Sequence, residues 1–109
     1  MEYLDKLKSA SEAKDNTIKS YLYGMREDTR VFSENLCEKV IENINKNSSK
    51  RKTSFKDRFP TQNRSVLELF ELMYKDEIHK ILIEKDYKVN INRYHDQVGY
   101  GIEVFVSWK

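Results

Sequence analysis

The amino-acid sequence predicts an α+β fold, in which helices pack on one face of a small antiparallel sheet. Residues 87–109 alternate apolar and polar side chains on both sides of a polar loop, a pattern typical of a β-hairpin. The residues before them place apolar side chains three and four positions apart, which indicates helices. Only three glycines and one proline occur, and this scarcity argues against a turn-rich all-β fold.

The size and composition of the chain favour a single domain, residues 1–109. With 109 residues, 39% of them hydrophobic and 35% charged, the chain can form one compact core beneath a densely charged surface. No apolar run approaches the ~18–20 residues that a membrane span needs, and the first residues lack the layout of a signal peptide. The single cysteine, Cys37, cannot form an internal disulfide. We therefore expect a cytoplasmic protein that does not contact membranes.

Residues 2–26 predict one kinked helix or two short ones. Side chains for one helix face recur at spacings of three and four, at Leu4, Leu7, Ala10, Ala13 or Lys14, Ile18, Tyr21, Leu22 and Met25. The short polar side chains at positions 15–17 compete for backbone hydrogen bonds and would interrupt a helix there. Gly24 would end it.

A second helix is predicted from about Thr29 to Ile44. Its apolar stripe consists of Phe32, Leu36, Cys37, Val40, Ile41 and Ile44. Asp28 and Thr29 are suitable N-cap residues. We expect the helix to fray over residues 45–49, where turn-forming side chains follow one another.

A short strand and a long helix are predicted between that helix and the hairpin. Thr53, Phe55 and Asp57 would share one face of the strand, which Pro60 would end. Ser65 and Glu68 form a capping-box pattern, so a helix is expected from there to residue 86. Its inward side chains would be Leu67, Phe70, Met73 or Tyr74, Ile78, Ile81 and Leu82.

The hairpin has a predicted buried face and a predicted exposed face. The buried face consists of Val89, Ile91, Ile102, Val104 and Val106. The exposed face carries Asn90, Asn92, Glu103 and Ser107, with Phe105 as an aromatic exception.

The sequence indicates neither catalysis nor metal binding. A nucleophilic enzyme needs an oriented general base, but His79 is expected on the flank of a helix, and His95 lies beside Asp96 in the hairpin loop, where such residues are ordinary turn material. Cys37 lies on an apolar helical stripe, where thiols are usually inert. No glycine-rich phosphate loop and no zinc or calcium spacing occurs. We therefore expect a protein that is not an enzyme and has no cofactor or metal site.

Basic residues concentrate in one segment of a chain whose net charge is only +2. Residues 46–64 include seven basic side chains and one acid, Asp57. The candidate phosphate-binding residues are Lys50, Arg51, Lys52, Lys56, Arg58 and Arg64. Arg64 would stand at the start of a helix, where free backbone amides attract anions. The alternative interpretation is a charged loop that faces solvent.

Aromatic residues in and near the hairpin form a candidate protein interface. They are Tyr94, Tyr100, Phe105 and Trp108. Tyrosine and tryptophan combine apolar area with a polar group, which suits an interface. In a small domain the same residues commonly cover the edge of the core instead. Self-association through an edge strand would make the protein a homo-oligomer.

The order of motifs resembles a group of small, mostly uncharacterised proteins of bacteriophages and prophages. The motifs are Ala10-Ser-Glu-Ala13-Lys-x-x-Thr17, the helix with Ile41 and Ile44, a short basic strand, Leu82-x-x-x-x-Tyr87-Lys-Val89 and Val106-Ser-Trp108. The segment between Lys52 and Ser65 is longer than that group leads us to expect. The resemblance implies a phage accessory protein in the host cytoplasm, acting on host machinery or defence by binding rather than by chemistry.

Three function classes follow from these observations. The first is a binding protein that modulates or inhibits a host protein, or sequesters a nucleotide-like ligand. The second is a nucleic-acid-binding accessory protein that uses the basic segment 46–64. The third is a structural or assembly component.

Overall fold

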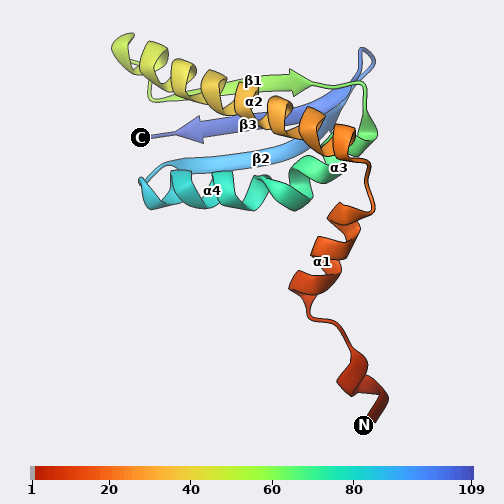
Figure 1. Cartoon of the computed structure of the whole chain (residues 1–109). Coiled ribbons are helices and arrows are strands. Elements are labelled where there is room, and N and C mark those ends of the chain that lie inside the picture. Colours follow the sequence, from red (N-terminus) through yellow and green to blue (C-terminus); the bar gives the residue numbers. More distant parts are fainter. Residues whose placement is uncertain (1) are drawn as a thin grey trace.

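The computed structural model of the chain describes residues 2–109 and confirms the α+β class. Its elements are a 3₁₀-helix η1 (Glu2–Lys6), α1 (Ala10–Lys19), α2 (Tyr23–Ser49), β1 (Ser54–Pro60), α3 (Arg64–Met73), α4 (Lys75–Glu84), β2 (Lys88–His95) and β3 (Tyr100–Ser107). Figure 1 shows α2, α3 and α4 grouped with the sheet, while η1 and α1 extend away from it. We call residues 2–19 the N-terminal arm.

The sheet has three antiparallel strands in the order β1-β3-β2, so the last strand of the chain is the central one. Val106 pairs with Val89 on one side and with Phe55 on the other. Since paired residues of antiparallel strands point to the same face, this register puts all three side chains toward the helices. The predicted buried face of the hairpin and the predicted strand near residue 55 are therefore confirmed. The prediction that Ser107 is exposed is wrong: it is buried beside the start of β1, where its hydroxyl donates to the Thr53 carbonyl at 3.4 Å.

The core lies between the sheet and the helices. It consists of Leu36, Val40, Phe55, Leu67, Phe70, Val89, Ile91, Ile102, Val104 and Val106. The ring of Phe32 from α2 meets that of Phe70 from α3 edge-on, with centroids 5.6 Å apart. The opposite face of the sheet carries mostly polar and charged side chains, because alternate residues of each strand point that way.

The predicted boundaries of the first two helices are wrong. The α1 helix continues through residues 15–17, where the Thr17 hydroxyl donates to the carbonyl of Ala13. The break falls instead at residues 20–22, and α2 already includes Gly24 and the two predicted N-cap residues. Thr29 is fully buried inside α2, and its hydroxyl donates to the Met25 carbonyl at 2.8 Å. A hydroxyl satisfied within the helix in this way does not need to cap a terminus.

The predicted fraying of α2 over residues 45–49 is also wrong, since the helix ends only at Ser49. The Ser48 hydroxyl donates to the carbonyl of Asn45 at 3.1 Å. The Asn47 side-chain amide donates to the carbonyl of Ser54 at the start of β1. Polar side chains that usually favour turns here bond back to the helix or across to the next strand, so the last turn is stabilised.

The predicted long helix over residues 65–86 is divided at Tyr74 into α3 and α4. The Tyr74 N–H still donates to the Phe70 carbonyl, and the Tyr74 carbonyl accepts from the Ile78 N–H. The chain therefore changes direction at Tyr74 without losing these two backbone hydrogen bonds. The cap of α3 is Asn63, whose side-chain oxygen accepts from the Ser65 N–H at 2.9 Å, rather than Ser65 itself. The Glu68 carboxylate accepts from the Tyr21 hydroxyl instead of closing a capping box.

Candidate functional site

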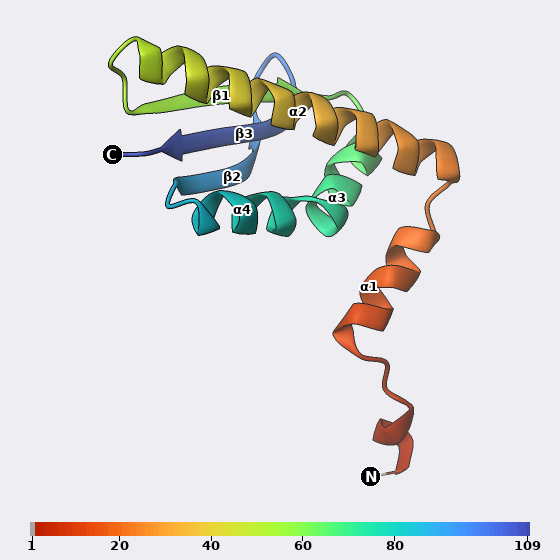
Figure 2. The ribbon, with the colours of Figure 1, turned by 60° about the vertical axis from the view of Figure 1, so that its left-hand side comes forward.

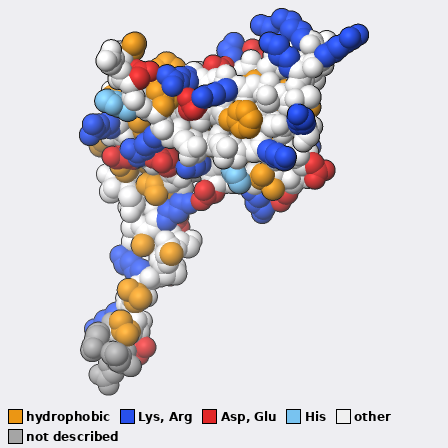
Figure 3. All heavy atoms as spheres, turned by 180° about the vertical axis from the view of Figure 1, so that it is seen from behind, with side chains coloured by type: hydrophobic (Ala, Val, Ile, Leu, Met, Phe, Trp, Pro, Cys, Tyr) orange, Lys and Arg blue, Asp and Glu red, His pale blue; other side chains and the backbone are white. Residues whose placement is uncertain are grey.

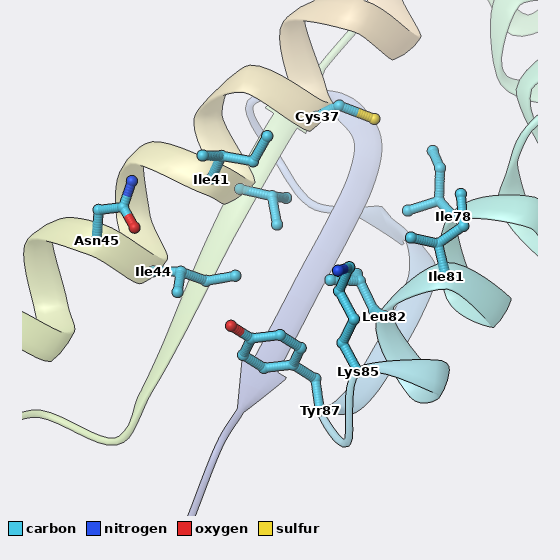
Figure 4. Close-up of a pocket in the computed structure, with 10 residues that line it drawn as sticks. Cys37, Ile41, Ile44, Asn45, Ile78, Ile81, Leu82, Lys85 and Tyr87 are labelled. Carbon is cyan, nitrogen blue, oxygen red and sulfur yellow. The ribbon is translucent and has the colours of Figure 1, made fainter.

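An apolar groove lies between the C-terminal half of α2 and the helix α4. Its volume is about 360 Å³. It is lined by Cys37, Val40, Ile41, Ile44, Asn45, Ile78, Ile81, Leu82, Lys85 and Tyr87. Figure 4 shows these side chains reaching toward one another from the two helices. We call this feature the α2–α4 groove.

Two isoleucines on opposite walls of the α2–α4 groove are open to solvent. Ile41 is 59% exposed and Ile81 is 46% exposed. Helical periodicity predicted both to face the core, and both predictions are wrong. The buried residues of α2 are Thr29, Ser33, Leu36 and Val40, so Ile41 lies on the flank of its stripe. Ile78 and Leu82 of α4 pack against the core, whereas Ile81 does not. Adjacent apolar side chains left uncovered in this way are typical of a binding surface.

The two ends of the α2–α4 groove differ in charge. Burial raises the pKa of the Cys37 thiol at one end, and the nearby carboxylates of Glu34 and Glu77 raise it further. Lys85 lines the other end beside Tyr87. The ring of Tyr87 is held there by an edge-on contact with Trp108, with centroids 6.3 Å apart. Glu34 is already paired with Arg30 at 2.7 Å, so the groove is an apolar floor with the charge of Glu77 near one end and that of Lys85 at the other.

The lining of the α2–α4 groove is suited to burying apolar groups. Six of its ten residues are valine, isoleucine or leucine, and its titratable side chains are Cys37, Lys85 and Tyr87. Cys37 is the only nucleophilic thiol in the chain, and its raised pKa keeps it protonated at neutral pH. A partner that bound here would gain free energy from the hydrophobic effect, because it would remove exposed isoleucine side chains from water.

The structure separates the predicted phosphate-binding residues into three places. Lys50, Arg51 and Lys52 are exposed at the turn between α2 and β1. Figure 3 shows Lys and Arg side chains gathered at one corner of the molecule. Arg64 begins α3, beyond the other end of β1. Because a seven-residue strand spans roughly 20 Å, these residues do not form one patch.

Lys56 and Arg58 lie between these two groups, on the open face of the sheet, and both bind acidic side chains. Glu103 accepts from Arg58 Nε at 2.9 Å and lies 3.5 Å from Lys56 Nζ. Arg58 also binds Asp96 at 2.8 Å and covers the ring of Tyr94, 4.7 Å from its centroid. The hydrogen bond from Arg58 is the main cause that lowers the pKa of Glu103. The positive charge of these two of the six predicted residues is thus balanced locally.

The predicted interface aromatics are distributed over both faces of the sheet. Phe105 lies on the open face, partly exposed, between its register partners Lys56 and Asn90. The Tyr100 hydroxyl donates to the Gln62 carbonyl at 2.6 Å, which ties the hairpin to the start of α3. Trp108 packs on the core side against Tyr87. The arrangement does not bring these four residues into one surface.

A second hollow does bring three of the predicted residues together at the hairpin end of the sheet. Its volume is about 330 Å³, and it is lined by Arg64, Leu67, Arg93, Tyr94, His95 and Tyr100. The rings of His95 and Tyr100 stack with centroids 6.4 Å apart. Arg93 binds the carboxylate of Glu71, so its charge is already balanced. We call this feature the hairpin hollow.

Comparison with known proteins gives no relative. No family model matches the chain, and neither a curated protein nor a solved structure matches it. None of the helices in residues 2–109 is long and apolar enough to cross a membrane. Within the same residues, no group of three or more His, Cys, Asp or Glu side chains stands close enough to hold a metal ion. Function must therefore be argued from the two hollows and the open sheet face.

Proposed function

We propose that this protein is a non-catalytic binding protein that takes an apolar segment of another polypeptide into the α2–α4 groove. The observation that carries the proposal is the exposure of Ile41 and Ile81 on facing walls of one apolar hollow. On α2 the lining runs from Cys37 to Asn45, a length of about 12 Å at the rise of an α-helix. This length accommodates about two turns of an amphipathic helix laid between two helices, a common mode of peptide recognition.

The resemblance to phage accessory proteins gives this proposal its biological setting. In that setting the bound segment belongs to a host protein, such as a defence factor, and binding modulates or inhibits it. An apolar groove with oppositely charged ends favours such a partner over a small polar ligand, because most of its surface offers no hydrogen bonds.

The proposal is tested by selecting binders from a display library of twelve-residue peptides. Wild-type protein should enrich sequences with apolar residues three and four positions apart, and Ile81→Lys should weaken their binding at least tenfold. Ile83→Lys is the matched control, because Ile83 lies on the same helix, is 45% exposed and does not line the groove. Equal binding by the two variants, or no enrichment by wild type, would overturn the proposal.

A second candidate function, nucleic-acid binding, is favoured by the exposed corner at Lys50, Arg51 and Lys52. Replacing all three by glutamate should abolish retention of single-stranded RNA at low salt, and wild-type affinity should fall steeply as salt rises. The control replaces Lys6, Lys8 and Lys14 of the arm by glutamate, the same change in charge at a distant place. Wild type that retains no RNA at low salt contradicts this function.

A further inference from the structure

The N-terminal arm carries apolar side chains that its own chain does not cover. Leu7 is 76% exposed and Leu4 is 50% exposed, and none of the residues of α1 is buried. Figure 3 shows hydrophobic side chains along this projecting segment. An extended arm gains almost no burial from its own domain, so covering these leucines by another surface would be favourable.

The arm is directed away from the α2–α4 groove of its own chain. The Tyr21 hydroxyl donates to the Glu68 carboxylate of α3, which fixes the base of the arm at the α3 end of the molecule. The groove lies at the opposite half of α2, between Cys37 and Asn45. Figures 1 and 2 show the arm leaving from the start of α2 and extending away from the sheet and α4. With its base held this way, the arm does not reach its own groove.

The arm and the groove fit one another in length and in charge. Leu4 and Leu7 are separated by about 6 Å at the rise of a 3₁₀-helix, which fits within the groove. Asp5 stands near the beginning of this segment, and Lys6 and Lys8 follow. Glu34 is already bound by Arg30 at 2.7 Å, so the acid that remains for the arm at this end is Glu77. Placing Asp5 toward Lys85 and Lys8 toward Glu77 pairs opposite charges at both ends. The same alignment puts Leu7 beside Cys37.

We propose that the α2–α4 groove receives the N-terminal arm of a second copy of this chain, and that two copies exchange arms. The inference rests on the proposed function, because it assigns an occupant to the same groove. A reciprocal exchange covers both grooves and both pairs of leucines, so it closes as a symmetric dimer and leaves no surface for further growth. A segment of another protein must then displace the arm, so the dimer regulates access to the groove.

A cross-linking experiment tests this arrangement with the native cysteine as one partner. Leu7→Cys introduces a second thiol in a chain whose only other cysteine is Cys37. Under a mild oxidant, the full-length variant should form a covalent dimer, and mass spectrometry of its peptides should find residue 7 joined to Cys37 in two bonds per dimer. Leu22→Cys is the matched control: its leucine is 80% exposed but lies outside the arm, and it should not join Cys37.

The position of the new disulfide decides between the occupants. A bond from residue 7 to Cys37 within one chain would overturn the exchange, because the groove would then hold its own arm. A dimer joined only through residue 7 in both copies would also overturn it, and combining Leu7→Cys with Cys37→Ser identifies such dimers. An unlinked variant in which residue 7 and Cys37 both stay reduced would overturn it as well.

A second experiment measures the dimer without cross-linking. Replacing Leu4 and Leu7 by lysine should lower the mass in light scattering from two copies to one, or raise the dimer dissociation constant at least tenfold, whereas Leu22→Lys should change it by less than twofold. An unchanged dissociation constant in the double variant, or a monomeric wild type, overturns the exchange. The same double variant separates the two proposals: selected peptides should bind it as well as or better than wild type. If they bind neither protein, the proposed function itself fails.

Discussion

The two halves of α2 meet their neighbouring helices in different ways. The N-terminal half packs closely against α3, where Phe32 and Phe70 touch edge-on and Phe70 is completely buried. The C-terminal half faces α4 across the α2–α4 groove, where Ile41 and Ile81 remain exposed. The close contact involves α3 and the open groove involves α4, and the chain divides into these two helices at Tyr74. This division lets α3 lie against α2 while α4 follows β2, so one amphipathic segment completes the core and then forms the wall of a groove.

The largest expected difference between the two contacts concerns stability. Phe70→Ala should lower the free energy of unfolding by about 3–5 kcal/mol, because it leaves a cavity in a fully packed site. Ile81→Ala should lower it by less than about 1 kcal/mol, because that side chain is already half in water. Urea denaturation of the two variants checks this. If the two variants lost similar amounts of unfolding free energy, Ile81 would have to be buried in solution, which would mean that the groove is closed there.

Enlarging a side chain should have opposite effects at the two contacts. Ser33 and Cys37 lie one turn apart on the same side of α2, but Ser33 is buried and Cys37 lines the groove. Ser33→Leu should destabilise the protein by about 1–3 kcal/mol through overpacking. Cys37→Leu should stabilise it by up to about 1 kcal/mol, since the added carbons cover the neighbouring isoleucines. Thermal unfolding measures both; a destabilising Cys37→Leu would show that the groove has no room.

Much of the fold could be predicted from the sequence, because side chains alternate between the two faces of a strand and only one assignment buries the apolar ones. Alternation over residues 87–109 assigned Val89, Ile91 and Val104 to the buried face, and the register agrees. Helix ends were harder to predict. Thr29 and Ser48 are typical of caps and turns, yet each bonds to a backbone carbonyl one turn back and stays within α2. Such local bonds depend on the surrounding packing, which periodicity does not describe.

The candidate site could not be predicted for a related reason. Periodicity assigned Ile41 and Ile81 to the core, yet both side chains are exposed. Where α4 lies depends on the break at Tyr74, where neither glycine nor proline marks the sequence. The charge pattern predicted a basic segment at residues 46–64, but it could not predict which acidic side chains would bind those basic residues. Glu103 and Asp96 stand about forty positions later in the chain than Arg58 and meet it only in the folded sheet.

A smaller effect is expected on the reactivity of Cys37, which lines the α2–α4 groove. Burial raises the pKa of this thiol, so less thiolate is present at neutral pH and iodoacetamide should react more slowly than with the unfolded chain. The rate should rise as pH passes the ordinary thiol value of about 8.5 and continue to rise above it. Ile81→Lys, which adds a cation and water to the groove, should speed the reaction several-fold at pH 7.5. An unchanged rate in Ile81→Lys, with Ile83→Lys as control, would mean that Cys37 does not share the groove with Ile81.

The smallest expected effect is a response to acid, and it distinguishes the apolar helix contacts from the open sheet face. Neither half of α2 depends on an ion pair with its neighbouring helix for its packing, so pH dependence should come from the sheet side. Arg58 lowers the pKa of Glu103 chiefly by its hydrogen bond, whereas the low pKa of Asp96 comes mainly from the N–H groups of Val98 and Gly99. A carboxylate with a lowered pKa stabilises the fold above its unfolded value of about 4, and this contribution disappears as pH falls through the folded value.

Arg58→Met should therefore have a lower melting temperature than wild type at pH 7 and approach the wild-type value at pH 3, while the effect of Phe70→Ala should not change with pH. A melting difference for Arg58→Met that stays constant down to pH 3 would show that Arg58 stabilises the sheet by packing on Tyr94 and not by its charge.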